Sequence, residues 1–182
     1  MFLEKNPSMH ASGGTLLVGA GNPLRRDDGA GIHVVRRLAA EGLPEGCESV
    51  ELPGGWLTLV DHLGRCRRLV VVDACDLGLS PGVVVEVDVR SLGEGGGTAW
   101  GTGHAVGLRD ALALAAEAGL AVPRDVRVFA IQVEDVEGWS DECSPPVTAA
   151  LGEACAAVRQ ALTVAVAVKL PATSSSSSGR AP

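Results

Sequence analysis

The stretch RLVVVDA, Arg68–Ala74, carries the strongest strand signal in the sequence. Its apolar residues are continuous and largely β-branched, whereas a strand with one solvated face would alternate between apolar and polar residues. Continuous runs of this kind are typical of strands that are covered on both faces by helices. The stretch therefore predicts the central strand of an α/β protein.

Apolar patterns on both sides of this stretch alternate between strand and helix. In 30–40, Ile32, Val35 and Leu38 recur at helical spacing, while Arg36 and Arg37 face outward. The segment 82–89 alternates towards its end, which suits an outer strand. Further strands are predicted at 15–20, 47–52 and 125–131, and helical segments at 56–63, 105–118 and 146–168, with a Gly-rich loop at 91–103. This alternation predicts a three-layer α/β/α sandwich around a mostly parallel sheet.

Length and charge restrict the class of protein further. The chain has 182 residues, of which 46% are hydrophobic, and a net charge of −7. One domain of ordinary size is expected, and the negative charge argues against nucleic acid or an anionic membrane as partner. Residues 1–14 have no apolar core like that of a secretory signal, and 171–182 are Ser-rich, so both ends are predicted to be disordered. A single α/β domain is left at 15–170, and we expect a cytoplasmic monomer.

The five cysteines contain no CxxC pair and are odd in number. This pattern argues against a disulfide framework and against a cysteine-type zinc site, and it favours reduced thiols. Cys75 lies two residues after Asp73, but no His–Asn pattern supports a nucleophile there. We interpret Cys75 as a small buried residue.

The loop GAGNPLRRDDGAG, Gly19–Gly31, resembles a nucleotide-binding loop at first sight. A GxGxxG motif would need glycine where Leu24 stands, and no Lys–Ser/Thr pair follows for a P-loop. Asp27 and Asp28 would also repel phosphate from the start of the following helix. The loop is better explained as a tight turn that points a carboxylate at a cation. Its arginines, 25 and 26, are interpreted as solvent-facing.

Three side chains are predicted to meet at one edge of the sheet, where the loops after parallel strands gather. Asp28 follows the first strand, Asp73 ends the central strand, and His104 precedes a helix. These residue types also have ordinary explanations. An Asp before a helix usually caps it, and we interpret the neighbouring Asp27 in this way. Asp73 can simply anchor a turn, and His104 can be a surface residue. Their combination favours a metal site.

Four blocks in order resemble the hydrogenase maturation endopeptidases. They are GAGNPLRRDDGAG, VVDA, GHAVGL and AIQVEDVEGWSDECSPPVTAAL, and the similarity covers roughly 16–162. The resemblance implies a mixed, mostly parallel five-stranded sheet. It also implies an endopeptidase that removes a C-terminal extension from the nickel-loaded large-subunit precursor of a nickel–iron hydrogenase.

The resemblance also assigns roles to residues. Asp28, Asp73 and His104 match the metal ligands, with nickel supplied by the substrate and other divalent cations able to occupy the site in vitro. Gly54 and Gly55 match a turn associated with substrate cleavage. Asp28 is our first choice of catalytic base, although the identity of that base stays open. Gly19, Gly21, Asn22, Gly29 and Gly31 match positions that shape the loop, and we place Asp27 with them.

Two departures from the family pattern affect what the resemblance implies. Relatives often have Glu where Asp28 stands, and many have Asp and Thr around the Gly-Gly turn where this chain has Pro53 and Trp56. Cleavage preference therefore stays open. The alternative function is a metal-sensing or chaperone-like protein that binds the hydrogenase precursor without cutting it, and a nucleotide-binding module ranks third.

Overall fold

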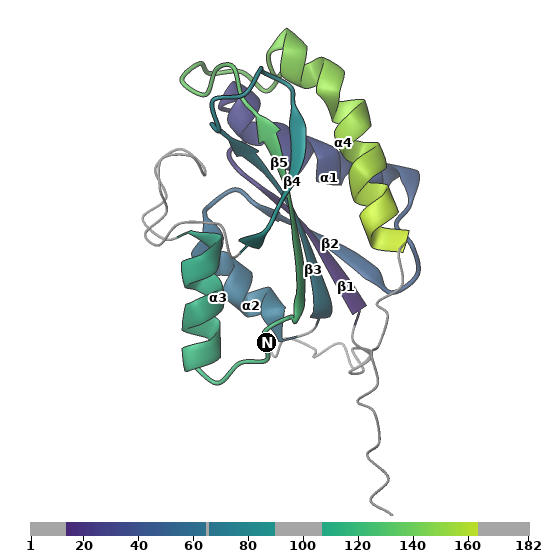
Figure 1. Ribbon diagram of the computed structural model, residues 1–182, viewed down its shortest axis with the longest axis vertical. Coiled ribbons are helices and arrows are strands. Elements are labelled where there is room, and N and C mark those ends of the chain that lie inside the picture. Colours follow the sequence, from purple (N-terminus) through teal and green to yellow (C-terminus); the bar gives the residue numbers. More distant parts are fainter. Residues whose placement is uncertain (1–13, 65, 90–106, 164–182) are drawn as a thin grey trace, which may run out of the picture.

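The computed structural model describes residues 14–64, 66–89 and 107–163, and these form a sheet with helices on both faces (Figure 1). The elements in chain order are β1 (Gly14–Ala20), η1 (Arg26–Gly29), α1 (Ala30–Glu41), β2 (Cys47–Leu52), η2 (Trp56–Leu59), α2 (Val60–Leu63), β3 (Cys66–Cys75), β4 (Val84–Val87), α3 (Leu108–Glu117), β5 (Asp125–Gln132) and α4 (Pro145–Thr163). The sheet has five strands in the order β2-β1-β3-β5-β4.

The predicted central strand is confirmed. β3 pairs in parallel with β1 on one side and with β5 on the other, and its last eight residues are all buried. β2 extends the parallel part of the sheet beyond β1, while β4 pairs antiparallel with β5. The sheet is therefore mixed and mostly parallel, as predicted.

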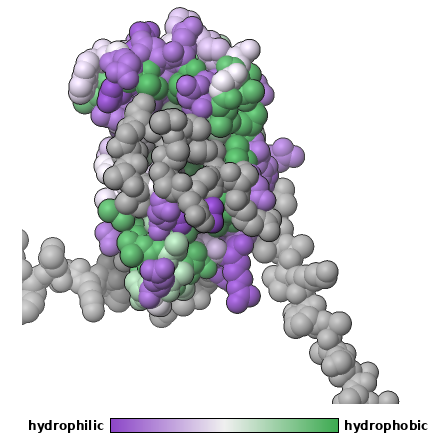
Figure 2. Space-filling view, turned by 60° about the vertical axis from the view of Figure 1, so that its left-hand side comes forward, coloured by the Kyte–Doolittle hydropathy of each residue, from purple (hydrophilic) through white to green (hydrophobic). Residues whose placement is uncertain are grey.

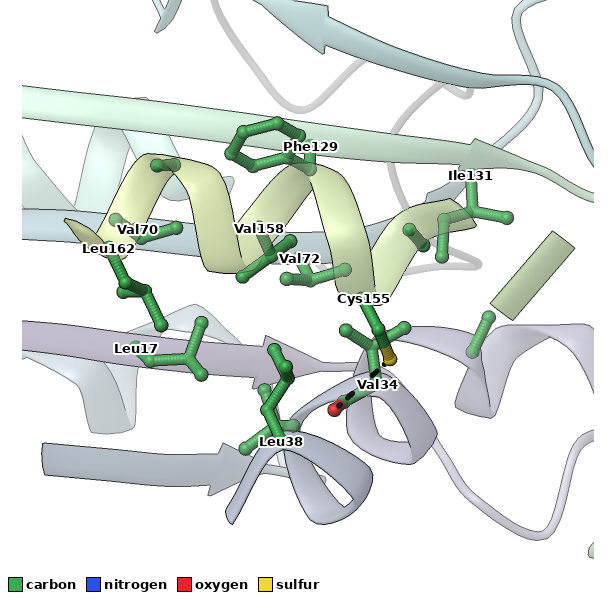
Figure 3. Packing of buried hydrophobic residues seen from close by; sticks show 14 of the residues in the cluster. Leu17, Val34, Leu38, Val70, Val72, Phe129, Ile131, Cys155, Val158 and Leu162 are labelled. Carbon is green, nitrogen blue, oxygen red and sulfur yellow. Dashed lines mark hydrogen bonds between the residues drawn. The ribbon is translucent and has the colours of Figure 1, made fainter. Parts of the chain in front are cut away.

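Side chains that alternate along the strands build one core on each face. Leu17, Val70 and Val72 pack with α1 and α4 on one face, where the Cys155 thiol also contacts the carbonyl of Val34 (Figure 3). On the other face, residues from η2, α2 and α3 pack against the sheet. This second core includes Leu16, Val18, Trp56, Leu59, Leu69, Val71, Leu108 and Val128. The three-layer α/β/α prediction is thus confirmed.

Several predicted boundaries change. β4 has four residues instead of the eight predicted at 82–89, and the helical segment 56–63 begins as a 3-10 turn. Of the helices predicted at 105–118 and 146–168, the structure describes α3 from Leu108 and α4 as far as Thr163. The predictions for 1–13, 91–103, 105–106 and 164–182 lie outside the described residues. Within the described ranges, no helix combines the length and apolar character needed to cross a bilayer.

Strands β1, β2, β3 and β5 all end at the same edge of the sheet, because they run parallel. We call this edge the carboxyl edge. The antiparallel β4 begins there, because Val84 pairs with Ile131 near the end of β5. The loops that follow the parallel strands therefore gather at this edge, which is where ligands bind in open α/β sheets.

Candidate functional site

Two buried carboxylates lie at the carboxyl edge. Asp28, in η1, is 3% exposed, and Asp73, near the end of β3, is 2% exposed. Burial and then the charge of Asp28 raise the pKa of Asp73 to about 8, although the N–H of Ala74 donates to Asp73 Oδ1 at 2.9 Å and opposes this shift. Burial next to a like charge disfavours ionisation, whereas a bound cation would favour it. The pair is thus suited to a divalent metal.

The turn after β1 holds Asp28 by its backbone. The N–H of Asn22 donates to Asp28 Oδ2 at 2.8 Å, and Asn22 Oδ1 accepts from the N–H of Leu24 at 3.0 Å. Gly21 has φ +113°, and a Cβ there would lie 1.7 Å from the carbonyl oxygen of Asp28. Only glycine fits this conformation and this distance.

Close backbone packing also brings α1 onto the sheet. A Cβ on Gly31 would lie 2.3 Å from the carbonyl oxygen of Val72, and one on Gly19 would lie 2.5 Å from that of Gly31. A Cβ on Gly29 would similarly meet Pro23 Cα at 2.7 Å. The first turn of α1 therefore contacts β1 and β3 directly, which places η1 and its carboxylate beside the strand that carries Asp73.

Gly21→Ala is expected to destabilise the chain by about 3 kcal/mol or more, because it combines backbone strain with a clash against Asp28. Gly42 is the matched control, since its φ is +95° but nothing lies within 4 Å of a Cβ there. Gly42→Ala should cost only about 1 kcal/mol. Urea unfolding of both variants measures the difference, and equal losses would show that the contact with Asp28 carries no weight.

Asp27 does not cap a helix, which corrects the interpretation from sequence. Neither η1 nor α1 has a side-chain cap, and Asp27 is fully buried. Its Oδ2 accepts hydrogen bonds from the N–H groups of Glu134 and Asp135, both at 2.9 Å, and from the Ser144 hydroxyl at 2.8 Å. Its Oδ1 accepts from the N–H of Ser144 at 2.6 Å. Asp27 therefore fastens the opening loop to the loop after β5.

Arg25 and Arg26 are half-buried, which corrects their interpretation as solvent-facing residues. The Arg26 guanidinium donates to Asp135 at 2.7 Å, and its backbone N–H donates to the carbonyl of Ser140 at 3.0 Å. The Arg25 guanidinium lies over the ring of Trp139, 5.9 Å from its centroid. Because these contacts join residues 21–29 to residues 133–144, we call the two segments together the double loop.

Gln132, the last residue of β5, was missed by the sequence reasoning. It is 3% exposed, and its Oε1 accepts the N–H groups of Leu77 at 2.7 Å and Leu79 at 3.2 Å. Its amide also donates to Asp76 Oδ1 at 3.1 Å. Gln132 therefore organises the loop that follows Asp73. The available signal was an amide directly after the predicted buried strand 125–131.

The remaining predicted site residues are placed as follows. Gly54 and Gly55 form the turn after β2, with Gly54 exposed and Gly55 at φ +99°. Trp56, the first residue of η2, is 3% exposed and belongs to the core that η2, α2 and α3 form with the sheet. The Trp at this position therefore serves packing. His104 lies outside the described residues, three positions before Gly107. Among the residues that the structure does describe, no group of three or more His, Cys, Asp or Glu could hold a metal.

The prediction that Cys75 is a small buried residue is confirmed. All five cysteines are free, and Cys75 is buried. Burial, with smaller contributions from the charges of Asp73 and Asp76, raises the pKa of the Cys75 thiol to about 12. Because the thiolate is the reactive form, this thiol is unsuited to nucleophilic attack at neutral pH.

Comparison with known proteins identifies the family. The model of a hydrogenase maturation protease family matches residues 32–161. A hydrogenase expression/formation protein of Azotobacter vinelandii is 33% identical over 137 residues, 75% of this chain and 66% of that relative's length. A putative hydrogenase maturation protease of Methanocaldococcus jannaschii is 40% identical over 81 residues, 42% of this chain and 51% of the relative. The chain therefore spans two thirds or less of these two relatives.

Solved structures share the fold. The hydrogenase maturating endopeptidase HybD from E. coli matches with a TM-score of 0.68 at 22% identity, covering 82% of this chain and 91% of that one. A hydrogenase 2 maturation peptidase from a Thaumarchaeota archaeon matches with a TM-score of 0.61 at 28% identity, covering 82% and 98%. These proteins define a class of α/β endopeptidases. The present chain belongs to the hydrogenase maturation protease family, which confirms the resemblance seen in its sequence.

Proposed function

We propose that this chain is an endopeptidase that removes a C-terminal extension from the nickel-loaded large-subunit precursor of a nickel–iron hydrogenase. The observation that carries the proposal is the pair of buried carboxylates, Asp28 and Asp73, at the carboxyl edge of a member of this family. We further propose that it acts as a monomer in the cytoplasm, where its five free cysteines stay reduced.

Nickel belongs to the substrate in this proposal. Asp28 and Asp73 would bind it through carboxylate oxygens, and His104 would add an imidazole nitrogen, a donor that suits nickel. The buried pair fits a cation, because a positive charge nearby would stabilise the ionised form of Asp73, which burial and Asp28 disfavour. A bound divalent metal can polarise a carbonyl group as a Lewis acid.

We propose that the protein's own groups orient the scissile segment and accept the proton as a general base. Asp28 is our first choice of general base, because η1 and the Asn22 N–H fix its carboxylate at the sheet edge. Gly54 and Gly55, in the turn after β2 at the same edge, are proposed to lie against the substrate backbone. Residues 133–144 keep η1 in place through their hydrogen bonds to the buried carboxylate of Asp27.

The experiment incubates the full chain with nickel-loaded and nickel-free precursor and measures intact masses. We expect the nickel-loaded precursor to lose its C-terminal extension and the nickel-free precursor to keep its mass. Cleavage of both would remove nickel from the recognition step. Unchanged masses together with a stable complex would instead indicate the metal-sensing or chaperone-like binding protein.

Gly54→Ala is expected to lower the processing rate at least tenfold while changing the free energy of unfolding by less than about 0.5 kcal/mol. The structural reason is that Gly54 is exposed and nothing lies within 4 Å of a Cβ there, so the added methyl can obstruct only a bound substrate. Gly152→Ala on α4, equally open, is the control and should process normally. Equal processing rates for the two variants would remove Gly54 from the substrate site.

A further inference from the structure

Exposed apolar side chains are concentrated at the carboxyl edge. Among the described residues, eight large apolar side chains are exposed, and six of them lie at this edge, five on loops and Leu57 in η2. We call these six the apolar rim: Leu24 (56% exposed), Leu57 (50%), Leu77 (36%), Leu79 (43%), Val83 (37%) and Trp139 (77%). The other two, Leu114 and Leu120, lie on α3 and on the connection that leads from it to the start of β5.

The apolar rim follows the whole sheet. Each loop after a parallel strand contributes at least one of its residues, and Val83 directly precedes β4, which begins at the same edge. At the upper end of the molecule, Figure 2 shows hydrophobic surface beside strongly hydrophilic surface. Single exposed apolar side chains are ordinary, whereas apolar surface gathered with polar groups around it marks interaction sites.

Three residues of the apolar rim, Leu77, Leu79 and Trp139, are held by contacts within the chain. Trp139 packs under the Arg25 guanidinium, which also forms an ion pair with Glu137 at 3.5 Å. The backbone of Leu77 and Leu79 is fixed by Gln132. Ordered side chains lose less conformational entropy on binding, and Trp is the residue type most enriched where binding energy concentrates.

The charge beside the apolar rim is negative. Asp76, Glu134, Glu137, Asp141 and Glu142 are exposed on the same loops. Arg25 and Arg26 form ion pairs with acidic residues of the double loop. Together with the net charge of −7, this arrangement attracts a basic partner surface.

We infer that the apolar rim docks the precursor protein itself, through a precursor surface that presents apolar side chains flanked by Lys or Arg. The inference rests on the proposed function and adds to it a substrate-binding surface separate from the carboxylates. Docking across the whole edge would hold the precursor while its C-terminal segment lies at Asp28 and Asp73.

Steady-state processing of nickel-loaded precursor tests this surface. Trp139→Ala and Leu79→Ser are each expected to raise KM at least tenfold and to change kcat less than twofold. The controls are Leu114→Ser and Leu120→Ser, which remove comparably exposed leucines away from the carboxyl edge and should change neither constant by more than twofold. If the rim variants and the controls share the wild-type KM, the inference is overturned.

A charge variant tests the chemistry of the partner. The double variant Glu134→Gln/Glu142→Gln is expected to raise KM at least threefold at low salt and to weaken the salt dependence of kcat/KM, because exposed charges act over a screened range. An unchanged salt dependence would contradict a basic partner surface. The other possible occupant is a second copy of this chain: a dimer in sedimentation that Trp139→Ala disperses would overturn the inference.

Direct binding separates failure of this inference from failure of the proposed function. If the wild-type chain binds nickel-loaded precursor without cutting it, the proposed function fails, and the dissociation constants of the same variants still test the apolar rim. A tenfold weaker complex for Trp139→Ala would support the rim in that case. An unchanged dissociation constant would contradict it.

Discussion

Asp73→Asn is expected to abolish processing and, at pH 8, to make the folded chain more stable than wild type by several kcal/mol. Asparagine keeps the acceptor for the Ala74 N–H and removes a buried carboxyl whose pKa is raised to about 8 by burial and by Asp28. Processing should stop because the variant lacks one of the two carboxylates proposed to bind the nickel of the substrate. Precursor mass and urea unfolding measure the two effects.

The raised pKa of Asp73 determines how the stability of the fold changes with pH. The folded pKa of Asp73, about 8, lies above its ordinary value of 3.8, so its contribution to stability is fully present below about pH 4 and is lost as pH rises through 8. Wild type and Asp73→Asn should therefore converge in acid and diverge towards pH 8. Asp61→Asn, an exposed carboxyl on α2, should follow wild type throughout. A variant that is less stable than wild type at pH 8 would contradict this account.

Asp27→Asn is expected to destabilise the chain by about 3 kcal/mol or more and to abolish processing as well. The buried carboxylate accepts three backbone N–H groups and one hydroxyl. An asparagine amide would turn a donor towards other donors and leave buried N–H groups without an acceptor. Residues 133–144 would then separate from η1, and Asp28 would lose its position.

Ser144→Ala is the matched control for Asp27→Asn, because it removes the hydroxyl and keeps the backbone N–H that donates to Asp27. We expect it to cost about 1 kcal/mol and to retain most of the processing rate. Urea unfolding and precursor mass again give both readings. If both variants lost the same free energy of unfolding, the Ser144 hydroxyl, and not the backbone N–H groups that donate to Asp27, would hold the two segments of the double loop together.

The fold was predictable because its signals are local. The continuous apolar run 69–72 requires cover on both faces, and the helical spacing of Ile32, Val35 and Leu38 selects the face of α1 that is buried. β4 was predicted too long, because alternation at 82–89 does not reveal where pairing with β5 stops.

The site was predictable only where position along a strand determines it. Asp73 lies near the end of the central strand, and Asp28 packs against Gly21, where a Cβ would have no room, so both reach the carboxyl edge. The partners of Asp27 lie 107 to 117 residues away, a pairing that no local pattern encodes. Gln132 was missed for the same reason, since its partners lie 53 to 56 residues away.

Anomalous scattering from a crystal of the full chain soaked with Cd²⁺ tests the central proposal most directly, because it locates the ion without relying on activity. The account predicts one strong peak at coordination distance from carboxylate oxygens of Asp28 and Asp73 and from an imidazole nitrogen of His104. A carboxyl edge without a peak, or a peak there with His104 too far away to share it, would contradict the account.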